Sequence, residues 1–306
     1  MGRLTALLLI LAASVFGLTL WATNPDLREV KQVFPLETFN RDIEIVLAGD
    51  VMLGRSVMAK ILEVGDPFYP FKAVADRLKE ADLVFVNLEN PVTRDCKPHL
   101  GGFTFCTTPE IAEGLNFAGV DIVNLANNHT FNYGRGGFEE TKEILDEQGV
   151  KWVGDNNLEV VTLKGTVFGF LGFDLTVKGL SQENLELIKK ADGEVDVLVV
   201  AVHWGVEYTR EPTKLQRTQA REIIKAGADV ISGHHPHWVQ ISETIEEKPV
   251  YYSLGNFIFD QMWSEETKKG VVVSLTYKDG ELKKAEEFPT YMKNWAQPEF
   301  IPQVDN

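Results

Sequence analysis

Short apolar runs alternate with amphipathic stretches along the middle of this chain. The runs end at polar residues and are typical of strands buried on both faces. Several of the intervening stretches repeat apolar residues at helical spacing, and Thr108-Pro109-Glu110 is a typical helix start. The pattern predicts strands over 43–48, 82–87, 120–125, 166–172, 195–202 and 228–232, and helices over 70–80, 109–118, 136–148 and 213–226. Such alternation predicts an α/β fold with a mostly parallel sheet covered by helices.

The character of the chain changes after residue 237. The following segments are short and rich in β-forming residues, and Lys278-Asp279-Gly280 is a typical hairpin turn. A second, more antiparallel set of strands is therefore expected over 238–246, 249–254, 270–278 and 281–288. The simplest organisation is one domain over 43–290, followed by a short polar tail over 291–306.

The N-terminus has the features of a membrane segment. Arg3 is followed by an uncharged, mostly apolar stretch over 4–22, which as a helix would rise about 28 Å and match a bilayer core. Trp21 stands where an interfacial anchor would lie. The sequence around it is a poor cleavage site for removal of a signal peptide. We expect 1–22 to be an uncleaved signal-anchor, with a removed signal peptide as the alternative, and 23–42 to be a stalk. Both alternatives place the domain outside the cytoplasm, in the first case on a single-pass membrane protein.

Charge and cysteine content narrow the class of protein. The net charge of −15 and a pI near 4.9 argue against a nucleic-acid partner, because phosphate binding favours a basic surface. The only two cysteines, Cys96 and Cys106, bracket a segment rich in proline and glycine that is typical of a loop. Outside the cytoplasm such a pair favours a disulfide, with two free thiols as the alternative.

Five of the six histidines lie in three short segments, each after a predicted strand. They are His129, His203, and the group His234, His235 and His237. Imidazole binds Zn, Mn and Fe, and the ends of neighbouring strands bring distant segments together. This pattern predicts a metal site, whereas isolated histidines at strand ends would more often be structural.

Two carboxylates occupy comparable positions. Asp50 ends the first predicted strand, and Glu89 follows the second, although Glu89 could instead cap the turn before Pro91. Together with asparagine and histidine they form a mixed oxygen and nitrogen donor set, which suits one or two divalent ions of Mn, Fe or Zn. A pair of such ions would suit hydrolysis of a phosphoester.

Six motifs in this order resemble the CapA/PgsA family of capsule and poly-γ-glutamate biosynthesis proteins, a branch of the calcineurin-like metallophosphoesterases. The resemblance runs from about residue 43 to residue 260. The motifs are Gly49-Asp50-Val51-Met52-Leu53-Gly54-Arg55, Asn87-Leu88-Glu89-Asn90-Pro91, Leu125-Ala126-Asn127-Asn128-His129, His203-Trp204-Gly205-Val206-Glu207-Tyr208, Gly233-His234-His235-Pro236-His237 and Tyr252-Ser253-Leu254-Gly255-Asn256-Phe257.

The resemblance implies a four-layer α/β/β/α sandwich with metal ligands on loops at strand ends. His129 would stabilise or protonate the leaving oxygen without binding metal, and Asn128 would help to place it. Arg55 is the most plausible anion-binding side chain near Asp50, since a guanidinium suits phosphate or carboxylate. The implied metal ligands are Asp50, Glu89, Asn128, His203, His235 and His237, with His234 as a further candidate.

The chain departs from the family pattern at two positions. Met52 stands where the superfamily usually has the histidine of an Asp-x-His motif, and a thioether is a poor replacement for imidazole. Asn132 stands where this branch typically has aspartate. We therefore expect one metal position to be weak and the orientation of neighbouring groups to be altered.

Two functional classes remain open at this stage. The first is a metal-dependent hydrolase that acts on a phosphoester or an acidic polymer in capsule or poly-γ-glutamate synthesis or export. The second is a non-catalytic assembly factor that binds metal or polymer and organises capsule synthase subunits at the membrane.

Overall fold

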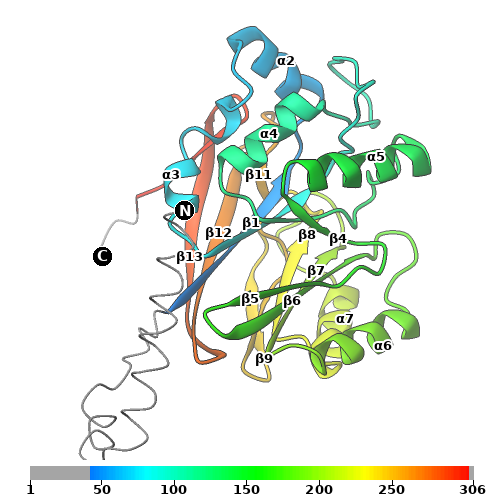
Figure 1. Cartoon of the computed structure of the whole chain (residues 1–306), viewed down its shortest axis with the longest axis vertical. Coiled ribbons are helices and arrows are strands. Elements are labelled where there is room, and N and C mark those ends of the chain that lie inside the picture. Colours follow the sequence, from blue (N-terminus) through cyan, green and yellow to red (C-terminus); the bar gives the residue numbers. More distant parts are fainter. Residues whose placement is uncertain (1–41, 303–306) are drawn as a thin grey trace, which may run out of the picture. The chain divides into compact units, whose positions relative to one another are not determined.

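Two β-sheets form the centre of the domain, and the computed structural model describes residues 42–302 (Figure 1). The first sheet has the strand order β14-β13-β12-β1-β2-β3-β4, with β11 paired to β1. β1 to β4 run parallel, whereas β12 to β14 run antiparallel. Its strands are β1 (Ile43–Val51), β2 (Leu83–Leu88), β3 (Ile122–Asn124), β4 (Lys151–Val153), β11 (Asn256–Ile258), β12 (Lys269–Lys278), β13 (Glu281–Asn294) and β14 (Gln297–Phe300).

The second sheet has the order β5-β6-β7-β8-β10-β9. Its central strands are parallel, and the outer strands β5 and β9 pair antiparallel with their neighbours. The strands are β5 (Glu159–Leu163), β6 (Thr166–Asp174), β7 (Val197–His203), β8 (Val230–His234), β9 (Ser242–Ile245) and β10 (Lys248–Tyr251).

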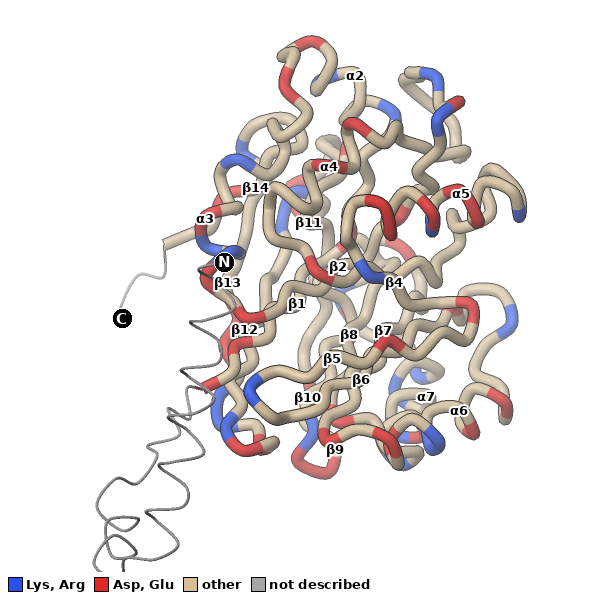
Figure 2. Tube along the Cα trace, in the orientation of Figure 1, with Lys and Arg blue, Asp and Glu red and all other residues tan. Residues whose placement is uncertain are grey.

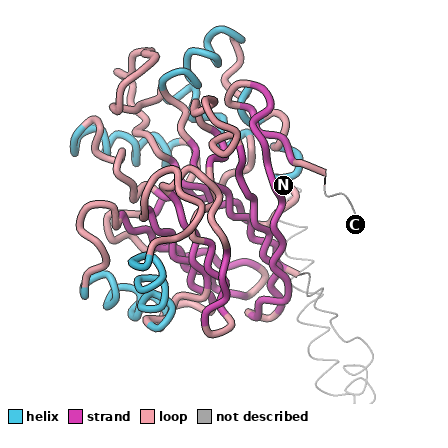
Figure 3. The backbone as a smooth tube through the Cα atoms, turned by 180° about the vertical axis from the view of Figure 1, so that it is seen from behind, coloured by secondary structure: helices cyan, strands magenta, loops and turns pink. Residues whose placement is uncertain are grey.

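Helices lie on the outside of the strand block, as Figure 3 shows from behind. The helices that pack on the first sheet are α2 (Arg55–Val64), η3 (Tyr69–Phe71), α3 (Ala75–Leu78), α4 (Pro109–Phe117) and α5 (Gly134–Glu147), and those on the second are α6 (Gln182–Asp192) and α7 (Lys214–Lys225). Charged residues concentrate on these helices and on loops, whereas the central strands carry few (Figure 2).

Three apolar clusters separate the layers. In β1, Ile45 and Leu47 face the second sheet, whereas Val46 and Ala48 face the helices of the first sheet. This alternation follows from the two-residue period of a strand. A third cluster lies between the second sheet and α6 and α7. The layers are therefore helices, sheet, sheet and helices, in agreement with the expected four-layer arrangement.

The six strands predicted before residue 237 are all present, with boundaries shifted by a few residues. The predicted helix over 70–80 is instead two short pieces, η3 and α3. The helices α2 and α6 were not predicted. The strands after residue 237 do not form a separate set, because β12 to β14 extend the first sheet and β9 and β10 extend the second.

The described domain extends beyond the expected boundary at residue 290. β13 continues to Asn294 and pairs with β14, so residues 291–300 belong to the first sheet and are not a tail. Met292 and Ala296 are buried in its apolar cluster, and Gln297 Nε2 donates to the Tyr69 carbonyl oxygen at 2.7 Å. Pairing with a distant strand stabilises this segment, which has little apolar periodicity of its own.

No helix among residues 42–302 is long and apolar enough to cross a membrane. The predicted anchor or signal segment over 1–22 and nearly all of the predicted stalk over 23–42 lie outside the described residues.

Candidate metal centre

The carboxyl ends of four strands from both sheets carry the candidate ligands. Asp50 lies near the end of β1, Glu89 directly follows β2, and His203 ends β7. All three side chains are fully buried. The loop 235–237 follows β8, which is the neighbour of β7 in the second sheet. The predicted convergence of distant segments at strand ends is therefore present.

A close backbone approach sets the position of Asp50. The Asp50 amide donates to the Gly255 carbonyl oxygen at 2.9 Å, and a bulge interrupts β1 just before this point. A β-carbon on Gly49 would lie 2.1 Å from the same oxygen, so only glycine fits there. The contact also brings Asn256 opposite Asp50 in the ladder between β1 and β11.

Asp50, Glu89 and His203 form the first candidate ligand group. One donor atom from each lies within 4.8 Å of the others. The Asn128 side-chain oxygen lies 3.0 Å from His203 Nε2 and faces the same group. All four residues belong to the set of six ligands that the family resemblance implies.

Glu207, His235 and His237 form a second group with the same maximum spacing of 4.8 Å between donor atoms. The Tyr208 amide donates to the Pro236 carbonyl oxygen at 2.8 Å, which ties the Glu207 loop to the histidine loop. Glu207 was missed in the sequence analysis, although it lies in the quoted His203–Tyr208 motif. Its position four residues beyond a strand-end histidine was the available signal.

The backbone around the second group is strained. Tyr208, His235 and His237 have φ values of 61°, 97° and 57°. Residues other than glycine rarely adopt these positive φ values, and each such residue lowers stability by about 1–3 kcal/mol. Strain of this kind is typical of functional sites, where the surrounding structure holds residues in place.

One oxygen of Glu89 provides the test of whether these residues fit a cation. Glu89 Oε1 is buried and has no hydrogen-bond donor. It lies 3.6 Å from His237 Nε2, 3.8 Å from His129 Nε2 and 4.0 Å from His203 Nε2. These distances exceed hydrogen bonds but suit atoms that share a cation. An unpartnered carboxylate oxygen facing three imidazole nitrogens fits a divalent metal.

The pKa values of the two carboxylates in the first group are shifted in opposite directions. Burial raises the pKa of Glu89 well above its usual value, and the Asp50 charge adds to this while His237 opposes it. Burial also disfavours ionised Asp50, but hydrogen bonds with His234 and His237 outweigh burial and hold the Asp50 pKa well below its usual value. For His237 the charges of Glu89 and Asp50 exceed the effect of burial and raise its pKa to about 9.

His203 and His235 are neutral at pH 7, because burial lowers the pKa of each ring and neighbouring histidines add to the effect. Neutral imidazole is the form that binds metals. His235 Nδ1 is buried and has no hydrogen-bond partner, so it is available as a donor atom.

Asn132 holds His129 beside the candidate metal centre. The Asn132 side-chain oxygen accepts from the Phe105 amide at 2.6 Å and lies 3.0 Å from His129 Nδ1. An oxygen in that position requires the proton on Nδ1, which leaves the lone pair on Nε2, toward Glu89. Burial lowers the His129 pKa to about 4. At pH 7 the ring is therefore neutral, with Nε2 unprotonated.

His234 belongs to neither ligand group. It is fully buried, with Nδ1 3.2 Å from Asp50 Oδ1 and Nε2 3.2 Å from the Ser232 hydroxyl. His234 therefore contacts and orients Asp50, and it is not one of the candidate ligands in either group.

A buried asparagine network supports the first group and was not foreseen. Asn87 Nδ2 donates to Asp50 Oδ1 at 2.9 Å, and the Asn87 side-chain oxygen accepts from Asn124 at 2.9 Å and Asn127 at 3.3 Å. These amides fix the orientation of the carboxylate and of the loop that carries Asn128.

Met52 packs away from the ligands. Its side chain is buried in the apolar cluster between the first sheet and its helices, and its sulfur accepts from the Gly54 amide at 3.1 Å. Asp174, the last residue of β6, pairs with His203 in the ladder between β6 and β7, and its carboxylate accepts from the Thr176 hydroxyl at 2.6 Å.

Arg55 lies next to the candidate metal centre, and both of its terminal nitrogens donate hydrogen bonds to other groups. Nη2 donates to Asp260 at 2.5 Å and Nη1 to the Gly102 carbonyl oxygen at 2.9 Å. The guanidinium stacks over the Phe105 ring at 4.2 Å, and Nε is buried without a partner. Anion binding by Arg55 stays a prediction, and only Nε is left to perform it in this arrangement.

Residues 44–261 match the model of the family described as bacterial capsule synthesis protein PGA_cap. This chain belongs to that family. It is 32% identical over 269 residues to the capsule biosynthesis protein CapA of Bacillus anthracis, a match that covers 78% of this chain and 65% of the relative. It is 30% identical over 291 residues to the PGA biosynthesis protein CapA of Bacillus subtilis, which covers 85% of this chain and 73% of the relative. The chain thus spans just under two thirds of the first relative.

Solved structures share the fold. A hypothetical protein from Thermus thermophilus superposes with a TM-score of 0.55 at 13% identity, covering 81% of this chain and 98% of the other. A Staphylococcus aureus protein described as a 5'-nucleotidase, in complex with alpha-ketoglutarate, superposes with a TM-score of 0.50 at 15% identity, covering 87% and 55%. These similarities show that the chain shares the two-sheet α/β fold of those structures.

Proposed function

We propose that this family member is a metal-dependent hydrolase of the phosphoesterase type, acting in capsule or poly-γ-glutamate synthesis or export. The observation that carries the proposal is the unpartnered oxygen of Glu89, which faces three imidazole nitrogens between two ligand groups. An uncompensated buried carboxylate is costly, and a bound cation would remove that cost.

Each ligand group offers a donor set suited to one divalent ion of Mn, Fe or Zn. Asp50, Glu89, His203 and Asn128 would hold the first ion, and Glu207, His235 and His237 the second. When bound, such ions would polarise a phosphoester and lower the pKa of water at the site.

His129 would act on the leaving side of the reaction. Hydrolysis breaks a P–O bond with water and returns a proton to the leaving oxygen. Asn132 holds the His129 ring with Nε2 toward the centre, and the added charge of a phosphoester would raise its pKa from about 4. His129 would thus take up a proton within the site and pass it to the leaving oxygen.

We place the domain outside the cytoplasm, tethered to the cell membrane by the segment over 4–22 and close to capsule synthase subunits. Support comes from the apolar sequence of that segment and from the disulfide between Cys96 and Cys106, since such bonds persist in oxidising compartments.

A non-catalytic assembly factor is the second candidate, and Met52 favours it. Its burial in the apolar core leaves the centre without the imidazole that the superfamily usually supplies there. A protein of this kind would use the centre to bind metal or polymer without turnover.

Metal analysis combined with hydrolysis of p-nitrophenyl phosphate by the full chain would distinguish the two. We expect stoichiometric metal after reconstitution and turnover that a chelator abolishes. His129→Ala should keep the metal and lose roughly 10²–10⁴-fold in rate, whereas His235→Ala should lose metal and rate together. Metal binding without turnover would favour the assembly factor, and substoichiometric metal would reject the centre itself.

A further inference from the structure

A pocket of about 330 Å³ opens beside the candidate metal centre. Its inner end is lined by His129, Glu207 and His237, so it connects directly with the proposed ligands. Its outer walls come from the loop 96–106 and from residues 260–263. The non-reacting part of a substrate held at the centre would therefore lie in this pocket.

The outer walls expose large apolar side chains. Leu100, Phe103 and Trp263 are 74%, 84% and 61% exposed, and all three line the pocket. The Trp263 ring packs edge-on against Tyr208 with ring centres 4.9 Å apart. Grouped apolar exposure of this kind at a pocket mouth is typical of a surface that contacts an apolar ligand.

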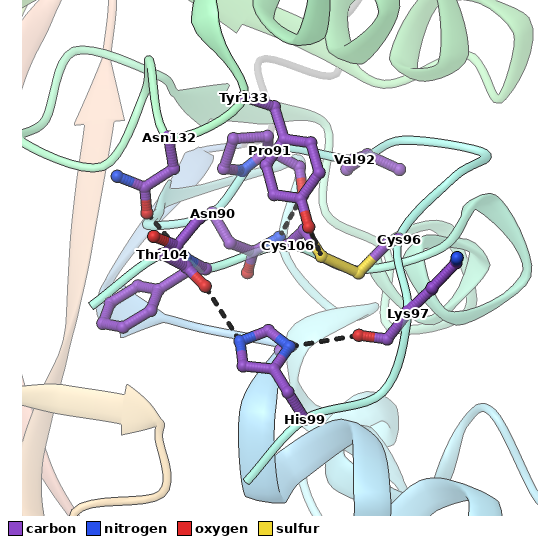
Figure 4. Close-up of a disulfide and its surroundings, with 12 residues drawn as sticks. Asn90, Pro91, Val92, Cys96, Lys97, His99, Thr104, Cys106, Asn132 and Tyr133 are labelled. Carbon is purple, nitrogen blue, oxygen red and sulfur yellow. Dashed lines mark hydrogen bonds between the residues drawn. A yellow bond between two sulfur atoms is a disulfide. The ribbon is translucent and has the colours of Figure 1, made fainter. Parts of the chain in front are cut away.

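The loop that carries Leu100 and Phe103 is braced in place. The disulfide closes it, and the His99 ring lies between two carbonyl oxygens of the loop, 3.1 Å from that of Lys97 and 2.8 Å from that of Thr104 (Figure 4). Arg55 adds the hydrogen bond to the Gly102 carbonyl oxygen. Such bracing holds the apolar side chains in place before a ligand arrives, which lowers the entropic cost of binding.

The charges of the pocket disfavour a carboxylate-rich ligand. Arg55 is the only lysine or arginine among the described residues that line it, and Asp260 neutralises that charge at 2.5 Å. Apart from the proposed metal ligands, a second anionic group on the ligand would therefore find no unpaired lysine or arginine in the pocket lining.

We infer that this pocket receives an apolar group attached to the phosphate, so that the preferred substrates are phosphoesters of an apolar alcohol and not segments of an acidic polymer. The inference rests on the proposed function, since it takes the phosphate to lie at the metal centre. Leu100, Phe103 and Trp263 are then specificity-determining residues.

Binding of alkyl phosphates to the metal-loaded full chain tests this, using calorimetry with inorganic, methyl, butyl and hexyl phosphate. Each methylene that leaves water strengthens binding by about fourfold, so the affinity for butyl phosphate should exceed that for methyl phosphate by at least tenfold. Phe103→Ser and Trp263→Ser should reduce this ratio severalfold and leave the affinity for inorganic phosphate unchanged. Val177→Ser is the matched control, because Val177 is also 84% exposed but does not line the pocket.

Equal affinity for methyl and hexyl phosphate would overturn the inference, whether or not the protein turns over a substrate. Tighter binding of a γ-linked glutamate oligomer than of butyl phosphate would also overturn it. If hexyl phosphate binds but inorganic and methyl phosphate do not, the proposed metal chemistry fails and the apolar pocket stands.

Discussion

Removal of the Cys96–Cys106 disulfide should destabilise the domain by an amount that loop length sets. The two residues are separated by 10 positions. Closing a loop of that length lowers the entropy of the unfolded chain by an amount equivalent to about 2.7 kcal/mol at 25 °C. For a domain of about 260 residues, this corresponds to a fall in melting temperature of roughly 5 °C.

The assay is urea unfolding of the full chain and of the Cys96→Ser/Cys106→Ser variant. Because the chain has only two cysteines, a reductant acts on this bond alone. Reduced wild type should match the variant, and the reductant should leave the variant unchanged, which serves as the control.

Loss of the disulfide should change ligand binding in the pocket as well as the stability of the domain. Phe105, next to Cys106, stacks on the His129 ring with centres 3.7 Å apart and lies under Arg55. The variant should therefore also lose part of the preference for longer alkyl phosphates. A stability change below about 0.5 kcal/mol, or an unchanged alkyl preference in a destabilised variant, would refute the reasoning that the bond holds this wall of the pocket.

Two further predictions concern single side chains at the centre. Glu207→Gln should remove the second ion and so lower the metal content, because Glu207 is the only carboxylate of that ligand group. Glu211→Gln is the control, since Glu211 is an exposed glutamate of the same loop and its substitution should leave the metal content unchanged. Equal metal content in both variants would exclude Glu207 as a ligand. Asn132→Asp should raise the His129 pKa from about 4 by roughly 1–3 units, because a carboxylate beside Nδ1 favours the charged ring. Histidine NMR titration of the chelator-treated chain measures this shift, and an unmoved pKa would contradict the assigned contact.

The local pattern of apolar and polar residues correctly predicted the parallel strands at the centre of the two sheets. Strands such as β1 and β7 were predicted because buried strands form apolar runs that end in polar residues. The segment over 291–300 was misassigned as a tail because its strands are stabilised by pairing with β12 and with each other, and such pairing has no short-range signature.

The residues of the candidate site likewise divide into those that local sequence features indicated and those that only tertiary contacts revealed. Residue type and strand-end position identified Asp50, Glu89 and the histidines at strand ends as candidate site residues that would converge. Neither property identified Asn87, whose role depends on contacts with Asp50 and Asn124 across three strands. Glu207 was missed because it follows no apolar run, and a backbone contact between two loops brings it to the histidines.

The sequence alone determined the α/β class, the family, the pair of cysteines that form the disulfide, and the strand ends at which the candidate metal ligands gather. These properties depend on residue type and on spacing along the chain, both of which can be read locally. Only the tertiary structure decided which donors share a group, which way His234 and Met52 face, and that the disulfide loop lines a pocket. Each of these depends on distances between residues far apart in sequence, and such distances are set by the packing of the two sheets and their loops.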